Sequence, residues 1–596
     1  MSKKILAVLL SLIIAMSVIA VPVGAEDAGA ASGISIENIF NMILDKLISF
    51  VLKYLNAFWP GYEDSWSTAE DYVPDNFYEG DTDFDETIAP GAQWSVGYAS
   101  ASLLDGISPM NGDFFLAGSL EPIAGRVPVK VEDDQRVRVY AMSDGTGGTM
   151  VHAVIDGFGL ARGDVQEIRE RFEEYANANN VTSVNVSVLH QHSCIDTLGM
   201  NVPLAQALLF NTGNAASGGL LEGQKVGLNP EFMENLYNKT VFCMKKAVNS
   251  MKPGDLYYGT ADISDYIRDK RDPQAFDGNI HRLRFAPEDG TAEIWIVEAG
   301  VHLMSYGAGG DVLSGDFPIY LERTLKEELG VNLVYIQGAE LAIGMRTVDV
   351  CAECGQVPEI VKPADEKGTY EICCPDGCLK TVASDEEGSE FTTEDAKDYV
   401  KTVDCWNRLS ETGLSNESAL SYGKTLAKKL MEITSEEVVA PVLNIAMQEV
   451  RLNVTNEILT LAAREDVLNS VIVKNGDNSY QLVTEIGYMQ LGNNLGIFLC
   501  PGEFDPALIY GGPASGGASW TGGDWTLPAL ADEIDCDNVM VFGLCNDQAG
   551  YVLRDNEYHS LLVENEEVNV ISNTAGSTFV NAFISLLDQI EADTAA

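Results

Sequence analysis

Hydrophobic positions along this chain follow two different periods. From about residue 91, short apolar runs with a two-residue period alternate with longer stretches of three- and four-residue spacing. The first period is typical of strands and the second of helices. Because strands alternate with helices, the pattern predicts an α/β fold, and we expect residues 91–596 to form one large mixed-sheet domain. The predicted strands are 151–155, 184–189, 293–297, 332–336, 495–500 and 539–544, and the predicted helices are 163–178, 317–329, 418–433 and 573–591.

The clearest strand is Val181–Leu189, in which valines alternate. The same period puts His190 and His192 on the valine face as the strand ends. Two imidazoles on one face can converge on one cation. The alternative is a pair of hydrogen-bonded histidines at a strand end. Because the chain has only six histidines, two in one tripeptide favour a site.

The N-terminus has the layout of a signal peptide, residues 1–25. Lys3 and Lys4 precede an almost entirely apolar run over 5–21, and small residues at 23–25 form a cleavage site. We therefore expect an exported protein, secreted or held at the cell surface. No later segment has a twenty-residue apolar span, so we expect no transmembrane helix.

Residues 26–90 are expected to hold an amphipathic helix over 34–59 and an acidic linker over 60–90. Such a helix can lie on a membrane surface, pair with a copy of itself or pack on its own domain. The formal net charge of -52 disfavours a nucleic-acid partner, since a phosphate backbone would be repelled. The acidity suits either cation attraction or the solubility of a secreted surface.

Four candidate ligands share one placement, directly after a predicted strand. His190 follows 184–189, and the others follow 293–297, 495–500 and 539–544; they are His302, Glu503 and Tyr551. Ligand sites of α/β sheets gather at strand ends. Two or three imidazoles with a carboxylate make a zinc site that leaves a position for water, which suits hydrolysis of an amide or ester. Taken singly, the same residues would be a core histidine, a turn carboxylate and a core tyrosine.

Five short motifs, in order, resemble the neutral (non-lysosomal) ceramidase family. The resemblance runs from about residue 93 to the C-terminus, apart from an insertion at 347–398. The motifs are Leu189-His-Gln-His-Ser193, Val301-His302, Ser314-Gly-Asp-Phe-Pro318, Pro501-Gly-Glu503 and Gly543-Leu-Cys-Asn546 through Tyr551 with Asn556-Glu-Tyr558.

The resemblance implies a role for each matched residue. It implies that one zinc ion is held by four residues, namely His190, His302, Glu503 and Tyr551. It also implies that His192 orients the substrate, which would be a ceramide-like N-acyl lipid. Lys270-Arg271-Asp272-Pro273 is the nearest match to a substrate-contacting stretch, which makes Arg271 a candidate.

Two departures from the family pattern affect the expected chemistry. The segment Gln337–Met345 lacks the family's serine, so metal-activated water would have to attack directly. Glu340 and Glu503 are then both candidates for moving the proton. The first tyrosine of the final family run is Gln548 here.

The insertion at 347–398 is rich in cysteine. Cys351, Cys354, Cys373, Cys374 and Cys378 have the spacing of a small zinc ribbon, with Cys351, Cys354, Cys374 and Cys378 as its expected ligands. Export favours disulfides instead. Either arrangement leaves one cysteine over.

The sequence thus predicts a secreted zinc-dependent amidohydrolase with a catalytic domain interrupted by a Cys-rich insertion. One alternative is a non-catalytic relative that binds a ligand at the cell surface. Another is a hydrolase acting on a different amide, such as a cell-wall fragment.

Overall fold

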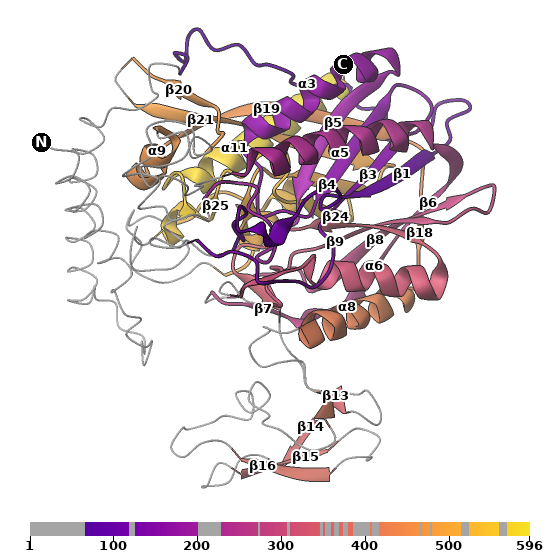
Figure 1. The fold of residues 1–596 in the computed structure, drawn as a ribbon. Helices are drawn as coiled ribbons and strands as arrows, with labels where there is room; N and C mark the ends of the chain where they lie inside the picture. Colours follow the sequence, from indigo (N-terminus) through magenta and orange to yellow (C-terminus); the bar gives the residue numbers. More distant parts are fainter. Residues whose placement is uncertain are drawn as a thin grey trace, which may run out of the picture.

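A computed structural model gives the architecture in Figure 1. Between residues 346 and 415 it describes only the backbone of five short strands, β13 to β17. Elsewhere the described residues are 66–118, 125–200, 228–271, 274–306, 310–345, 416–464, 468–476, 479–513, 524–558 and 569–595.

The larger sheet has nine strands. They are β1 (Ser95–Ser102), β3 (Arg136–Ser143), β4 (Thr149–Ile155), β5 (Val181–Val188), β6 (Lys252–Asp262), β8 (Asn279–Pro287), β9 (Ile294–Ala299), β11 (Asn332–Gln337) and β18 (Glu437–Val439). Their order is β11-β9-β8-β6-β1-β3-β4-β5, with β18 paired to β6. The sheet is mixed, because β4 and β5 are parallel, β9 and β11 are parallel, and the other pairs are antiparallel.

The second sheet has five strands, of which β22 and β24 are parallel. They are β19 (Leu443–Asn453), β20 (Ile472–Lys474), β21 (Tyr480–Leu491), β22 (Leu495–Leu499) and β24 (Asn538–Phe542). Short two-stranded pairs lie beside the main sheets: β2 (Lys130–Val131) with β10 (Val312–Leu313), β7 (Ile267–Asp269) with β12 (Ile343–Met345), and β23 (Glu503–Phe504) with β25 (Tyr551–Val552).

Helices cover the outer faces of the two sheets (Figure 1). The helices are α3 (Arg162–Ala178), α5 (Pro230–Asn249), α6 (Asp316–Leu329), α8 (Asn416–Met431), α9 (Glu457–Arg464), α10 (Pro506–Tyr510) and α11 (Ala575–Thr594). Apolar side chains of α3 and α5 share a core with β3, β4 and β5. The opposite face of these strands packs against β22 and β24, and α11 covers the far side of the second sheet. The order of layers is therefore helix, sheet, sheet, helix.

The two sheets join where β5, β11 and β24 end. Ser187 forms a bridge with Cys545, and the Gly543 amide donates to the Gln337 carbonyl at 2.8 Å. Each of the residues from Ser183 to Val188 is buried, because helices lie on one side of β5 and the second sheet on the other. The ends of these strands therefore come together where the two sheets meet.

The mixed α/β architecture with a large mixed sheet is confirmed. The predicted strand over 184–189 is β5, and the predicted helix over 573–591 is α11. The segment expected to be a linker contacts the second sheet in its described part. Phe84 is buried and stacks on Tyr488, with ring centroids 6.1 Å apart. No helix among the described residues is both long and apolar enough to cross a membrane.

Several predictions fall outside what the structure describes. The signal peptide and the 34–59 helix lie before residue 66, and the side chains of the cysteine cluster are not among those described. Within the insertion, β14 (Glu359–Lys362), β15 (Thr369–Cys373) and β16 (Lys380–Ser384) form a small antiparallel sheet.

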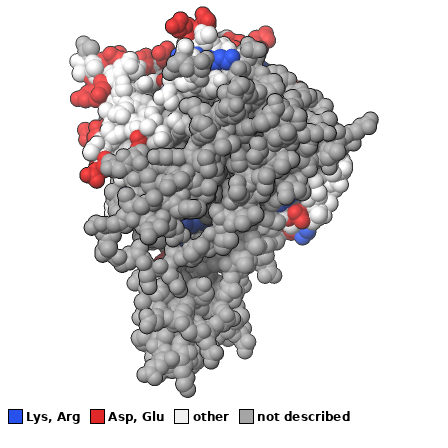
Figure 2. Space-filling view, turned by 90° about the vertical axis from the view of Figure 1, so that its left-hand side faces the viewer, with Lys and Arg blue, Asp and Glu red and all other residues white. Residues whose placement is uncertain are grey.

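The described surface in Figure 2 carries many acidic side chains along its upper edge and fewer basic ones.

Candidate metal centre

Three buried histidine rings meet where the strands end: His190, His192 and His302. Each ring donates a hydrogen bond from Nδ1 to a backbone carbonyl, which can only accept. The acceptors are Phe158 for His190 at 2.9 Å, Gly118 for His192 at 3.0 Å and Ile343 for His302 at 3.0 Å. The lone pair of each neutral ring is therefore on Nε2, as in metal-binding histidines held by a backbone carbonyl.

The turn after β5 brings the rings together. The strand ends at Val188, and His190 has a left-handed backbone conformation with a φ of 57°. Ring centroids are 4.7 Å apart for His190 and His192, and 5.0 Å apart for His190 and His302. The predicted convergence of His190 and His192 therefore occurs, but a left-handed turn beyond the strand produces it, rather than strand alternation alone.

Glu503 lies between two of the rings. Its Oε2 atom is 3.3 Å from Nε2 of His190 and 3.2 Å from Nε2 of His302. Ligand atoms of the three histidines lie within 4.8 Å of one another, and the same holds for His190, Glu340 and Glu503. All five residues are buried. The ligand atoms of three rings and two carboxylates thus converge on one small volume.

Burial keeps the imidazoles neutral. It lowers the pKa of His190 to about 4, which the Glu503 carboxylate opposes and His302 reinforces. Burial, together with His190 and His302, also holds the pKa of His192 well below its usual range. At neutral pH both rings are therefore in the form that binds a metal ion.

Glu340 is the second carboxylate, in the turn after β11. Gln337 donates a hydrogen bond to its Oε2 atom, which lies 3.6 Å from Nδ1 of His302. Its Oε1 atom is buried and makes no hydrogen bond among the described residues. Burial and the neighbouring Glu503 raise the pKa of Glu340 well above the usual value. The chain thus has a buried acid in the turn that follows β11.

The loop that carries Glu503 is fixed to the loop before Tyr551. Glu503 pairs with Tyr551 in the β23–β25 ladder, and the Glu503 amide donates to the Gly550 carbonyl at 3.1 Å. Paired residues of neighbouring strands project to the same face. Tyr551 is half-buried, and its ring packs beside the apolar cluster formed by Leu341, Ala342, Leu553 and Val570. The pairing therefore puts Tyr551 beside Glu503 in the ladder.

Arg271 lies just after β7 and is half-buried. Burial raises the pKa of Asp505 to about 6, and the Arg271 guanidinium opposes this shift. Because Asp505 comes two residues after Glu503, Arg271 lies near the carboxylate loop. Its neighbour Lys270 contributes to lowering the pKa of His192. Lys270 is therefore a basic group near the imidazoles that the sequence did not single out for a role.

The sequence also missed two contacts of the candidate ligands. The Phe158 ring stacks on His190, with centroids 4.4 Å apart, and lies edge-on to His192 at 5.2 Å. Gln548 donates from Nε2 to Oε1 of Glu503 at 2.9 Å. Phe158 follows the predicted strand over 151–155, and this position is the signal that could have found it. Gln548 was noted in the sequence only because it replaces the first tyrosine of the final ceramidase-like motif.

The residues present fit a divalent cation. The Nε2 atoms of His190 and His192 are buried and make no hydrogen bond within the described part of the chain. A buried polar atom left without a partner costs about 1–3 kcal/mol. Imidazole nitrogens with carboxylate oxygens suit zinc and other first-row divalent ions. This His/Glu group can therefore hold a metal ion.

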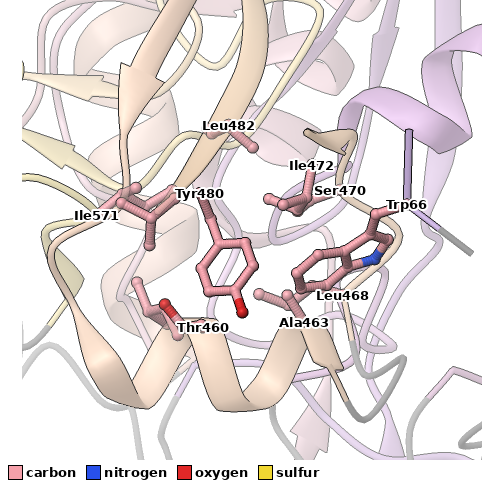
Figure 3. Close-up of a pocket in the computed structure, with 11 residues that line it drawn as sticks. Trp66, Thr460, Ala463, Leu468, Ser470, Ile472, Tyr480, Leu482 and Ile571 are labelled. Carbon is pink, nitrogen blue, oxygen red and sulfur yellow. The ribbon is translucent and has the colours of Figure 1, made fainter. Parts of the chain in front are cut away.

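A separate apolar pocket lies between α9, β20 and β21 (Figure 3). The pocket is partly open to solvent, and Trp66 meets Tyr480 edge-on there, with ring centroids 5.3 Å apart. None of the residues of the candidate metal centre lines this pocket. Ile571 does line it, and the adjacent Val570 belongs to the apolar cluster beside Tyr551.

Known structures share this fold. No protein-family model matches the chain, and no curated protein matches it. The crystal structure of neutral ceramidase from Pseudomonas aeruginosa is similar with a TM-score of 0.55 and 13% sequence identity, covering 84% of this chain and 75% of that one. A ceramidase complexed with C2 is similar with a TM-score of 0.53 and 14% identity, covering 84% of this chain and 76% of that one. The chain therefore has a ceramidase-like fold, a mixed α/β architecture built around a large mixed sheet.

Proposed function

We propose that this protein is a zinc-dependent hydrolase that cleaves the amide bond of a ceramide-like N-acyl lipid. The observation that carries this proposal is the convergence of His190, His192 and His302, each with Nδ1 bound to a carbonyl, on two buried carboxylates. The ceramidase-like fold supports the choice of an amide bond, and the neighbour complexed with C2 supports a lipid ligand.

In this proposal His190, His302, Glu503 and Tyr551 hold the metal ion. When bound, zinc lowers the pKa of a water molecule toward about 7 and polarises a carbonyl. His192 orients the substrate, with Arg271 at the rim. Exported from the cytoplasm, the protein would reach lipid at a membrane surface, with residues 34–59 as the contacting segment.

Glu340 is proposed as the group that holds and delivers the proton. Glu503 has Oε2 between two imidazoles and so is better placed as a ligand. Glu340 is fully buried, and its raised pKa keeps a proton on the carboxyl at a pH where an exposed glutamate has lost it. A buried acid of this kind can protonate the amine that leaves when an amide breaks.

The test is turnover of N-acyl lipids of graded acyl length by the zinc-loaded protein. We expect wild type to release the amine, and Glu340→Gln to lose about 10²- to 10⁴-fold in kcat, the usual contribution of general acid–base catalysis. Glu340→Gln is expected to bind zinc as wild type does, and Glu327→Gln on the exposed part of α6 serves as the control. An unchanged kcat in Glu340→Gln would remove the proposed acid.

A second candidate function is ligand binding without catalysis. The observation in its favour is the absence of a serine between Gln337 and Met345. Zinc and lipid bound stoichiometrically, with no product from any N-acyl substrate, would favour this alternative.

A further inference from the structure

The two oxygens of Glu503 have different surroundings. Oε2 lies 3.3 Å and 3.2 Å from the Nε2 atoms of His190 and His302, whereas Oε1 accepts a hydrogen bond from Nε2 of Gln548 at 2.9 Å. A carboxylate can only accept, so the amide of Gln548 must turn its NH₂ group toward Glu503. The hydrogen bond thus selects which oxygen faces the imidazoles.

Gln548 is itself held on both sides. Its backbone amide donates to Oδ1 of Asp547 at 2.8 Å, and the same oxygen accepts from the Arg162 amide at the start of α3 at 2.9 Å. Asp547 is buried, with 2% of its surface exposed. The next amide, of Ala549, donates to the Pro501 carbonyl at 3.0 Å. The loop around Gln548 is therefore fixed both to α3 and to the loop that carries Glu503.

The backbone segment that contacts Gln548 also accepts a hydrogen bond from the ring of His190. A Cβ atom placed on Gly159 would lie 3.0 Å from Cγ of Gln548, so backbone and side chain are in close contact there. Gly159 follows Phe158, whose carbonyl accepts the Nδ1 proton of His190 at 2.9 Å. The segment Phe158–Gly159 thus contacts Gln548 and also fixes the ring of His190.

We propose that Gln548 is a positioning residue, which holds Oε1 of Glu503 so that Oε2 faces the Nε2 atoms of His190 and His302 and would be available to a metal ion held there. This inference rests on the proposed function, because it needs the metal ion. Carboxylate ligands of metals are generally held by such outer hydrogen bonds, and removing one typically lowers metal affinity 10- to 100-fold. Gln548 stands where the ceramidase-like pattern has a tyrosine, so the amide donor is a feature of this chain.

The experiment measures zinc affinity by competition with a chelator, using the full mature protein. The variants are Gln548→Met, which keeps the length but removes the donor, and Gln548→Ala. The control is Gln481→Ala, since Gln481 makes a similar hydrogen bond, 2.9 Å to Asn453, on an exposed surface. We expect the dissociation constant to rise about 10- to 100-fold in both Gln548 variants and to stay unchanged in the control.

Thermal unfolding of the metal-free proteins separates positioning from general packing. A merely structural role would lower the Tm of the metal-free variants and leave zinc affinity as in wild type, and this result would overturn the inference. If Gln548→Ala does not fold, Gln548→Met decides alone. Wild type that binds no zinc would instead defeat the proposed function, so the two failures are distinguishable.

Discussion

At the scale of single residues, the candidate centre depends on the backbone that surrounds each imidazole. Gly118 is the acceptor for His192, and its φ of 114° is one that side-chain-bearing residues rarely adopt. A Cβ atom at this position would lie 2.5 Å from the carbonyl oxygen of His192. Glycine is therefore required here both for the conformation and for the close approach.

We predict that Gly118→Ala weakens zinc binding and destabilises the protein. The added methyl group must displace the His192 backbone, and a strained φ alone costs about 1–3 kcal/mol. Zinc affinity and urea unfolding would measure the two effects. Gly147→Ala is the matched control, because an added Cβ there meets nothing within 4 Å. Equal zinc affinity in Gly118→Ala and Gly147→Ala would contradict the role given to this contact.

At the scale of elements, buried charges hold the strands in place around the site. Arg169 of α3 donates to the Val184 carbonyl of β5 and pairs with Glu485 of β21 at 2.6 Å. One guanidinium thus links a helix, the strand that leads to His190 and the second sheet. Removing one partner of such a buried ion pair strongly destabilises a protein, because the other charge stays buried without a counter-charge.

A second buried group lies across β8 and β9. His281 is the cross-strand partner of Glu298, and its Nε2 atom lies 2.6 Å from Oδ2 of Asp277 and 3.9 Å from Oε2 of Glu298. Burial raises the pKa of Glu298 to about 8, a shift that His281 opposes and Asp277 reinforces. The folded protein therefore keeps a proton on Glu298 that the unfolded chain releases near its ordinary pKa.

This linkage makes stability fall as pH rises. A raised carboxyl pKa contributes stability that is complete below the unfolded value, about 4.5, and is lost as pH rises through about 8. One proton gives a slope of at most about 1.4 kcal/mol per pH unit. We predict that the free energy of unfolding in urea falls less steeply with pH in Glu298→Gln than in wild type between about pH 4.5 and about pH 8. Glu327→Gln is the control. The same slope in Glu298→Gln and wild type would refute the linkage.

The sequence predicted the elements well where the signal is local. Alternating valines located β5, and the position directly after a strand singled out His190, His302 and Glu503, whose side chains lie close together in the structure. The sequence named Glu340 as a candidate for moving the proton, but it could not show the distance between Glu340 and the histidines, because this depends on how β11 and β24 join across the two sheets. It also could not show the left-handed turn at His190 or the hydrogen bond of Gln548, since both are set by contacts between distant segments.

At the scale of the whole molecule, the layered fold brings together ligands from remote parts of the chain. His190 lies after β5 of the larger sheet and Glu503 after β22 of the second sheet, and their side chains are 3.3 Å apart. A metal ion bound between them would link the two sheets. We therefore expect that a metal ion bound there would stabilise the whole domain.

The most direct test is the zinc content of the purified protein and of His190→Ala, by elemental analysis after zinc reconstitution. His190→Ala removes one proposed ligand and leaves the other proposed ligands in place. We predict that His190→Ala holds about one zinc ion per chain fewer than wild type, as a single site of this kind requires. Wild type without zinc, or His190→Ala with as much zinc as wild type, would contradict it.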